Sequence, residues 1–289
     1  MQTMNLSELE SLRKMKLKIS RSISTGEGQR RSGKKGRSAE FSGYREYIPG
    51  DDMRYIDWNA YARFDKLYIK EFMEEREGRV SIYLDTSRSM EFGSKLKSTL
   101  MSELTEAISY AAISARDAVN VTDLGSGRTI RLPSGGQGLP FLRNFLEKIE
   151  PNGRVNILEA MKKVKPQRGG AAFLISDFMD EAFLDGEEEL LRLFGFYNSR
   201  LTLLHVLSGE ELNVDDMGAF QLIDSEEEEK SLHLTIDRLT IESYKKRLDA
   251  YMKELKTKAE KQGAAYILCR TDKPLKAVLY EDMRGIYDI

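Results

Sequence analysis

Three side chains with oxygen donors stand at two-residue spacing after an apolar run. The stretch IYLDTSRSM, residues 82–90, contains Asp85, Ser87 and Ser89, and a later apolar run, AAFLISD, ends in Asp177. Carboxylate and hydroxyl oxygens suit Mg²⁺, which takes about six oxygen ligands at roughly 2.0–2.1 Å. The pattern predicts a metal site if the two runs are neighbouring strands. Helix capping and turn formation remain the competing interpretation, because both also favour Ser and Asp.

The elements that would position these residues alternate between strands and helices. Such alternation predicts an α/β fold with a doubly wound, mostly parallel sheet, in which ligands bind beyond the carboxyl ends of the strands. An antiparallel hairpin is expected around the acidic turn at 224–230. The expected strands are 79–85, 118–124, 128–133, 171–177, 200–207 and 264–270, and the expected helices are 94–116, 137–149, 156–164, 186–196 and 239–262.

The region before the first of these strands has a different composition. We divide the chain into an N-terminal segment, 1–78, and a sheet domain, 79–289. The segment begins with an amphipathic stretch at 5–19 and continues as a basic Gly/Ser loop at 20–38. Residues 41–78 are rich in aromatic side chains, each of which can bury about 150–250 Å². We therefore expect this helical and extended segment to be ordered and packed on the sheet domain.

Composition excludes several classes of protein. The chain has 289 residues, 45 basic and 47 acidic side chains and a formal net charge of −2, which does not suit a phosphate-binding track and disfavours nucleic acid as a partner. Its single cysteine cannot form an internal disulfide, as expected in a reducing compartment. No apolar run approaches the roughly 20 residues of a membrane span. We therefore predict a soluble cytoplasmic protein.

Two motifs resemble known families. The D-x-S-x-S pattern, with Asp177 closing a later strand, resembles the metal-ion-dependent adhesion site of von Willebrand factor A domains. The preceding stretch, GRSAEFSGYREYIPGDDMRYIDWNAYARFDKLYIKEFMEE, resembles the signature of the domain of unknown function fifty-eight family, in which a von Willebrand factor A-like domain follows. Together the resemblance covers roughly 25–289. It implies a von Willebrand factor A-like, Rossmann-like fold and a bound Mg²⁺, with Mn²⁺ and Ca²⁺ as alternatives.

The sequence departs from the adhesion-site pattern at one ligand. Where that site has a threonine hydroxyl at a helix start, the stretch GRVNILEAM, residues 153–161, has Val155, which cannot bind a metal. Asn156 could supply an oxygen instead, or a water could replace the hydroxyl. The candidate metal ligands are therefore Asp85, Ser87, Ser89, Asp177 and Asn156, and the departure predicts a degenerate site with weak affinity.

The leading function is a non-enzymatic protein-interaction adaptor. The family resemblance implies a MoxR-type AAA+ ATPase, or the protein client of that ATPase, as the partner in protein assembly or remodelling. A metal at the site would hold a carboxylate of the partner. The alternative is a Mg²⁺-dependent phosphatase or phosphotransferase of the haloacid dehalogenase type, but those enzymes need Asp-x-Asp and position 87 is Ser. His205 lies in an apolar run and is expected to be a core residue rather than a base.

Overall fold

The structure, a computed structural model, divides the chain into two compact units, residues 23–77 and residues 1–22 with 78–289. The residues that it describes are Glu10, Leu12, Lys16–Leu17, 40–73, 78–151, 153–214, 218–223, 231–236 and 238–288. The basic loop at 20–38, most of the stretch at 5–19 and the acidic turn at 224–230 lie outside these residues.

A six-stranded sheet forms the centre of the larger unit, in the order β11-β8-β7-β4-β5-β6. All neighbouring strands are parallel except β6, which pairs antiparallel with β5. The predicted doubly wound, mostly parallel α/β fold is therefore confirmed. The strands are β4 (Arg79–Leu84), β5 (Ala118–Asp123), β6 (Thr129–Arg131), β7 (Ala171–Ser176), β8 (Arg200–Leu207) and β11 (Ala265–Arg270).

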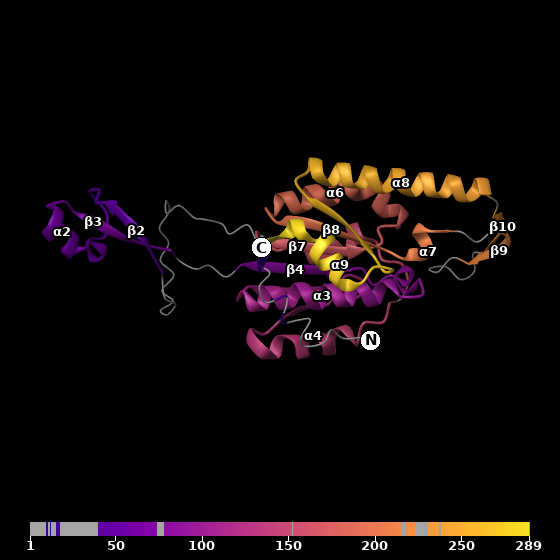
Figure 1. The fold of residues 1–289 in the computed structure, drawn as a ribbon, viewed down its shortest axis with the longest axis horizontal. Coiled ribbons are helices and arrows are strands. Elements are labelled where there is room, and N and C mark those ends of the chain that lie inside the picture. Colours follow the sequence, from indigo (N-terminus) through magenta and orange to yellow (C-terminus); the bar gives the residue numbers. More distant parts are fainter. Residues whose placement is uncertain are drawn as a thin grey trace. The chain divides into compact units, whose positions relative to one another are not determined.

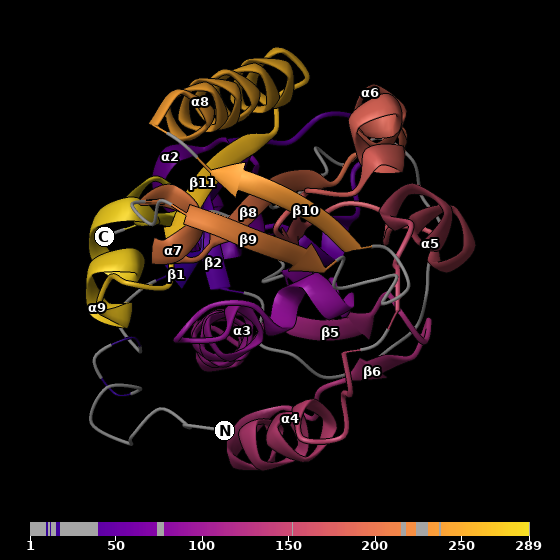
Figure 2. The ribbon, with the colours of Figure 1, turned by 90° about the vertical axis from the view of Figure 1, so that its right-hand side faces the viewer.

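Helices cover both faces of this sheet. In Figure 1, α6 and α8 lie over one face, and α3 and α4 lie over the other. Figure 2 shows the same two layers end-on, with α5 beside α6. The longer helices are α3 (Lys97–Ser114), α4 (Gly138–Leu146), α5 (Ile157–Val164), α6 (Glu181–Phe196) and α8 (Arg238–Lys261). The short ones are α7 (Gly209–Leu212), α9 (Leu275–Ala277), η2 (Arg88–Glu91), η3 (Gly135–Gln137), η4 (Val278–Asp282) and η5 (Arg284–Ile286).

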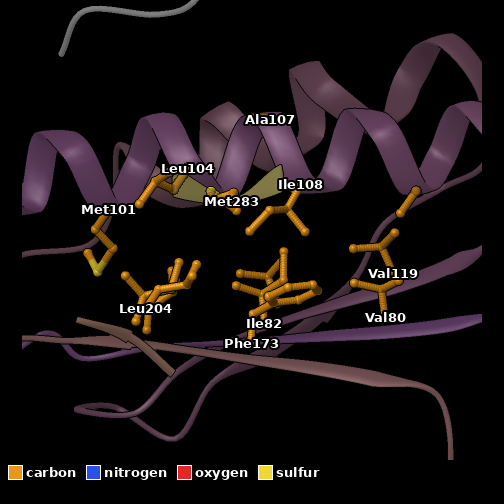
Figure 3. Packing of buried hydrophobic residues seen from close by; sticks show 14 of the residues in the cluster. Val80, Ile82, Met101, Leu104, Ala107, Ile108, Val119, Phe173, Leu204 and Met283 are labelled. Carbon is orange, nitrogen blue, oxygen red and sulfur yellow. The ribbon is translucent and has the colours of Figure 1, made fainter. Parts of the chain in front are cut away.

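The central strands bury both of their faces, which explains why they read as continuous apolar runs. Along β4, Val80 and Ile82 face the core under α3, whereas Tyr83 faces the core under α5 and α6. Figure 3 shows the first of these cores, where Leu104 and Ile108 of α3 meet side chains of the strands. Side chains along the central strands therefore alternate between two cores.

The N-terminal residues differ from the expected division of the chain. Strand β1 (Lys16–Leu17) pairs antiparallel with β12 (Tyr287–Asp288). Leu12 and Leu17 are buried in the core under α3, so residues before 23 belong with the sheet rather than with the segment that follows them. The side chains of Leu12 and Leu17 are the physical reason, because they complete a core that the sequence alone could not locate.

The smaller unit is an antiparallel hairpin with one helix. Strands β2 (Glu40–Glu46) and β3 (Tyr68–Met73) pair, and η1 (Met53–Tyr55) and α2 (Trp58–Phe64) lie between them in the sequence. Gly50 has a φ of +110°, and the Asp51 N–H donates to the Ile48 carbonyl, so the Pro49-Gly50 pair forms a tight turn of the kind that these two residues favour. Packing of this unit on the sheet domain stays a prediction.

Two further predictions concern the sheet domain. The hairpin expected at 220–236 is confirmed, because β9 (Gly218–Ile223) pairs antiparallel with β10 (Ser231–Ile236). Within the part of the chain that the structure describes, no helix is both long and apolar enough to cross a bilayer.

Candidate functional site

Asp85 and Asp177 follow two adjacent strands at the point where the strand order reverses. From β4 the chain continues to β5 on one side of the sheet, whereas β7 pairs with β4 on the other side. Asp85 comes directly after β4 and Asp177 directly after β7, and the Asp85 N–H donates to the Ile175 carbonyl at 3.0 Å. This switch point is where doubly wound sheets bind ligands. We call the surroundings of these two strand ends the carboxyl edge.

Both carboxylate oxygens of Asp85 accept hydrogen bonds inside the protein. Oδ1 accepts from the Ser87 N–H at 2.9 Å, and Oδ2 accepts from the Ser176 hydroxyl at 2.6 Å. Burial, followed by the negative charge of Asp177, raises the pKa of Asp85 to about 6, although the Ser176 and Ser87 hydrogen bonds oppose that rise. Asp85 is thus a buried carboxylate that interacts directly with the charge of Asp177.

The two serines of the motif lie against each other beside Asp85. The Ser87 and Ser89 hydroxyl oxygens are 3.0 Å apart, and Ser87 is buried whereas Ser89 is partly exposed. The Ser89 hydroxyl also helps to lower the pKa of Asp177, so it lies near that carboxylate. The four residues Asp85, Ser87, Ser89 and Asp177 are therefore gathered at one end of the sheet.

Lys97, which no sequence motif indicates, lies beside these four residues. The Lys97 ammonium, at the start of α3, donates to Asp177 Oδ2 at 2.7 Å and to Glu211 Oε1 at 2.7 Å. Burial is the strongest influence on Asp177 and acts to raise its pKa, but the Lys97 charge and the hydrogen bonds from Lys97, Ser89 and the Met179 N–H together outweigh burial and hold that pKa below its usual value. Burial also acts to lower the pKa of Lys97, and Asp177 and Glu211 together reverse that effect and raise it. The three side chains form a buried ion triad.

Glu211 reaches Lys97 because a capping box fixes α7. The Ser208 hydroxyl accepts from the Glu211 N–H, and Glu211 Oε2 accepts from the Ser208 N–H at 2.7 Å. The S-x-x-E pattern at 208–211 is a sequence signal for a helix start, and it could have located α7. It could not have shown that the second carboxylate oxygen binds a lysine 114 positions away.

Asn156 and Val155 have structural roles. Asn156 is the N-cap of α5, and its Oδ1 accepts from the Glu159 N–H at 2.9 Å. Val155 is 6% exposed and belongs to the core under α5 and α6. The Gly153 carbonyl accepts from the Arg88 N–H at 3.0 Å, so this loop does run beside the D-x-S-x-S loop, as the family resemblance implies.

The arrangement of these side chains bears on the magnesium prediction. Asp177 is already paired with an ammonium, both oxygens of Asp85 accept hydrogen bonds, and the oxygen of Asn156 caps a helix. Among the described residues, no group of three or more His, Cys, Asp or Glu is arranged to hold a metal. As they lie, these side chains do not fit Mg²⁺, which needs about six oxygen ligands. The magnesium site stays a prediction.

His205 is a core residue, as expected. It is fully buried in β8, and its Nδ1 is 2.7 Å from the Tyr266 hydroxyl. Burial lowers the pKa of His205 to about 4, so the ring is neutral at physiological pH. A histidine enclosed in this way cannot exchange a proton with a substrate at the carboxyl edge.

The sheet and the polar cluster at its switch point define the class, an α/β protein with a doubly wound sheet. The profile of a family described as "Protein of unknown function DUF58" matches residues 43–255, which is more than half of the chain. The chain belongs to this family, and the family resemblance found in the aromatic stretch is confirmed. No curated protein matches the chain.

Two of the solved structures that match the chain each cover more than two thirds of it. One is titled "Crystal Structure of the SpRpn10 VWA domain", with 8% identity and a TM-score of 0.38, covering 71% of this chain and 94% of that one. The other is an uncharacterized membrane spanning protein from Vibrio fischeri, with 15% identity and a TM-score of 0.22, covering 72% of this chain and 98% of that one.

Proposed function

We propose that this chain is a non-enzymatic protein-interaction module that binds a partner at the carboxyl edge of its sheet. The observation that carries the proposal is a pair of exposed apolar side chains, Phe92 and Met179, beside the charged cluster. Phe92 is 49% exposed, and its ring lies 5.8 Å from the Lys97 ammonium. Met179 is 38% exposed, and its N–H donates to Asp177 Oδ1 at 3.2 Å. Exposed large apolar side chains can become the buried apolar contacts that dominate the binding energy of protein interfaces.

The chemistry of the cluster supports binding rather than catalysis. A nucleophilic carboxylate works together with a nearby acid or base. Both oxygens of Asp85 accept hydrogen bonds, and the residue two positions later is Ser87, whose hydroxyl is no acid at neutral pH. The Lys97 ammonium is held by two carboxylates, and His205 is enclosed. These contacts favour the adaptor over a phosphatase of the haloacid dehalogenase type.

The partner in this proposal is a MoxR-type AAA+ ATPase or the protein client of that ATPase. The support is the family resemblance, together with an edge that offers apolar contacts from two loops. Phe92 follows η2 and Met179 follows β7, so a partner that touches both would lie across the strand ends. A partner carboxylate bridged by a metal remains the alternative mode of contact. It requires that the ion displace Lys97 from Asp177.

Binding to a purified MoxR-type ATPase from the same organism tests the proposal. Phe92→Ala and Met179→Ala should each weaken the complex about 5- to 30-fold, which corresponds to about 1–2 kcal/mol for truncating an apolar contact. Biolayer interferometry with the full chain immobilised gives the dissociation constants. Neither substitution removes a core side chain, so the unfolding transitions should stay close to that of the unchanged protein.

Phe141→Ala is the matched control. Phe141 is also 49% exposed, but it lies on α4, whose first residue, Gly138, approaches Ile113 near the end of α3. Lys97 is at the opposite end of this 18-residue helix, which is about 27 Å long at 1.5 Å per residue. The control should bind as the unchanged protein does. Equal affinity of all four proteins, or no complex with the ATPase or its clients, would refute the proposal.

A further inference from the structure

The buried ammonium of Lys97 lies where three elements of the carboxyl edge meet. Lys97 begins α3, Asp177 ends β7, and Glu211 belongs to α7 after β8. The lysine side chain is 1% exposed, and its Nζ is 2.7 Å from a carboxylate oxygen of each partner. A single cation thus connects elements that are 80 and 114 positions apart in the sequence.

The location of this lysine is unfavourable unless the site requires a positive charge. Lys97 is the first residue of α3, and the amino end of a helix carries a partial positive charge that repels cations. Burial of an ammonium also removes its hydration, which only close counter-charges offset. Here Asp177 and Glu211 supply those charges, and the Phe92 ring adds a cation–π contact at 5.8 Å.

The carboxylates near Lys97 are those that would otherwise attract a divalent ion. Asp85, Asp177 and Glu211 all lie at this edge, and Asp177 and Glu211 both contact the ammonium. A divalent ion that used Asp177 would have to replace the ammonium or sit beside it. Like charges at such a short range repel strongly in a buried site. Lys97 and a metal ion therefore compete for the same position.

We propose that Lys97 is the built-in cation of the carboxyl edge. Its ammonium takes the place of a divalent ion, joins Asp177 to Glu211, and makes the edge independent of metal. Removal of the ammonium frees the Asp177 and Glu211 carboxylates, which can then close around a divalent cation in its place. This role concerns the isolated chain, so it holds or fails independently of which partner binds at the edge.

Mn²⁺ binding by the isolated full-length chain tests the proposal, with electron paramagnetic resonance reporting the free ion. The unchanged protein should bind Mn²⁺ at least about tenfold more weakly than Lys97→Ala, because the ammonium repels the ion and occupies Asp177. Added Mg²⁺ should compete with Mn²⁺ in the variant, and it should raise the melting temperature of the variant but not that of the unchanged protein.

Lys95→Ala is the matched control, because it removes a lysine two positions away that pairs with Glu103 at 2.7 Å and is 33% exposed. This control should bind Mn²⁺ as weakly as the unchanged protein. Equal Mn²⁺ affinity of the unchanged protein and Lys97→Ala would overturn the proposal. Mn²⁺ binding by the unchanged protein would also overturn the proposal if Ser87→Ala abolished that binding, because the site would then hold a metal with the lysine in place.

A second variant covers the case in which Lys97→Ala does not fold. Lys97→Gln keeps most of the side-chain stem, removes the charge and offers an amide oxygen to an ion. It should gain Mn²⁺ affinity and melt at a higher temperature in Mg²⁺ than in EDTA. A folded Lys97→Gln without either change would overturn the proposal. If both variants stay unfolded even with Mg²⁺, the Mn²⁺ titration of the unchanged protein decides. No binding would support the proposal, and binding that Ser87→Ala abolishes would overturn it.

Discussion

Replacement of Asp85 by asparagine should make the stability of the sheet domain less dependent on pH. Asp85 is buried, and its pKa is raised from 3.8 to about 6, first by burial and then by the charge of Asp177. The folded protein therefore holds this proton at a pH where the unfolded chain has released it. The contribution of Asp85 to stability is full below about pH 4 and is lost as the pH rises through about 6.

The raised pKa sets the size of the effect. A pKa shift from 3.8 to about 6 corresponds to about 3 kcal/mol of unfolding free energy, at 1.36 kcal/mol per pKa unit. About 2 kcal/mol of this contribution is lost between pH 4.5 and 7.5. In Asp85→Asn this loss should disappear. The new amide oxygen can still accept from the Ser87 N–H, and the amide N–H can donate to the Ser176 hydroxyl. The variant should therefore keep its fold.

Urea unfolding followed by circular dichroism at several pH values measures the effect. The unfolding free energy of the unchanged protein minus that of Asp85→Asn should fall by about 2 kcal/mol from about pH 4.5 to 7.5. His205, whose pKa is lowered to about 4, destabilises the fold as the pH falls below about 6.5, but it is present in both proteins and cancels in the difference. Asp249→Asn, on the exposed face of α8, is the control and should show no such trend. A constant difference for Asp85→Asn, or one that rises with pH, would show that Asp85 is charged in the fold.

Two further predictions concern the smaller unit and the loop before α5. Asp57→Ala should destabilise the smaller unit by about 1–2 kcal/mol, because Asp57 caps α2 and accepts from the Tyr44 hydroxyl. The fluorescence of the neighbouring Trp58 reports this loss, and Glu46→Ala, which removes an exposed ion pair with Lys66, should change it little. Val155→Thr should lower the stability of the sheet domain by about 1–2 kcal/mol, because it buries a hydroxyl in an apolar core. The sequence predicts tighter Mg²⁺ binding by this variant. Because the Lys97 ammonium occupies the position of the ion, we instead expect no heat of Mg²⁺ binding in a calorimetric titration of Val155→Thr. A measurable gain in Mg²⁺ affinity would count against that expectation.

Local pattern accounts for most of the architecture. The apolar runs at 171–177 and 200–207 predict strands, and both strands lie in the middle of the sheet. Alternation with amphipathic helices predicts the doubly wound order, because crossovers between parallel strands need helices. The turn at Pro49-Gly50 is equally local, since its glycine supplies the positive φ. These features depend on neighbours in the sequence, and the sequence alone therefore determines them.

Only the tertiary structure decided what surrounds the predicted site residues. Asp85 and Asp177 could be placed at strand ends from the sequence, because each directly follows an apolar run. Lys97 looked like one of many lysines on a helix, and no local pattern shows that its ammonium is buried between Asp177 and Glu211. Such a contact depends on how α3, β7 and α7 pack at one edge of the sheet. Charge pairing over 80 and 114 positions leaves no periodic signal, so only the folded chain reveals which cation these carboxylates hold.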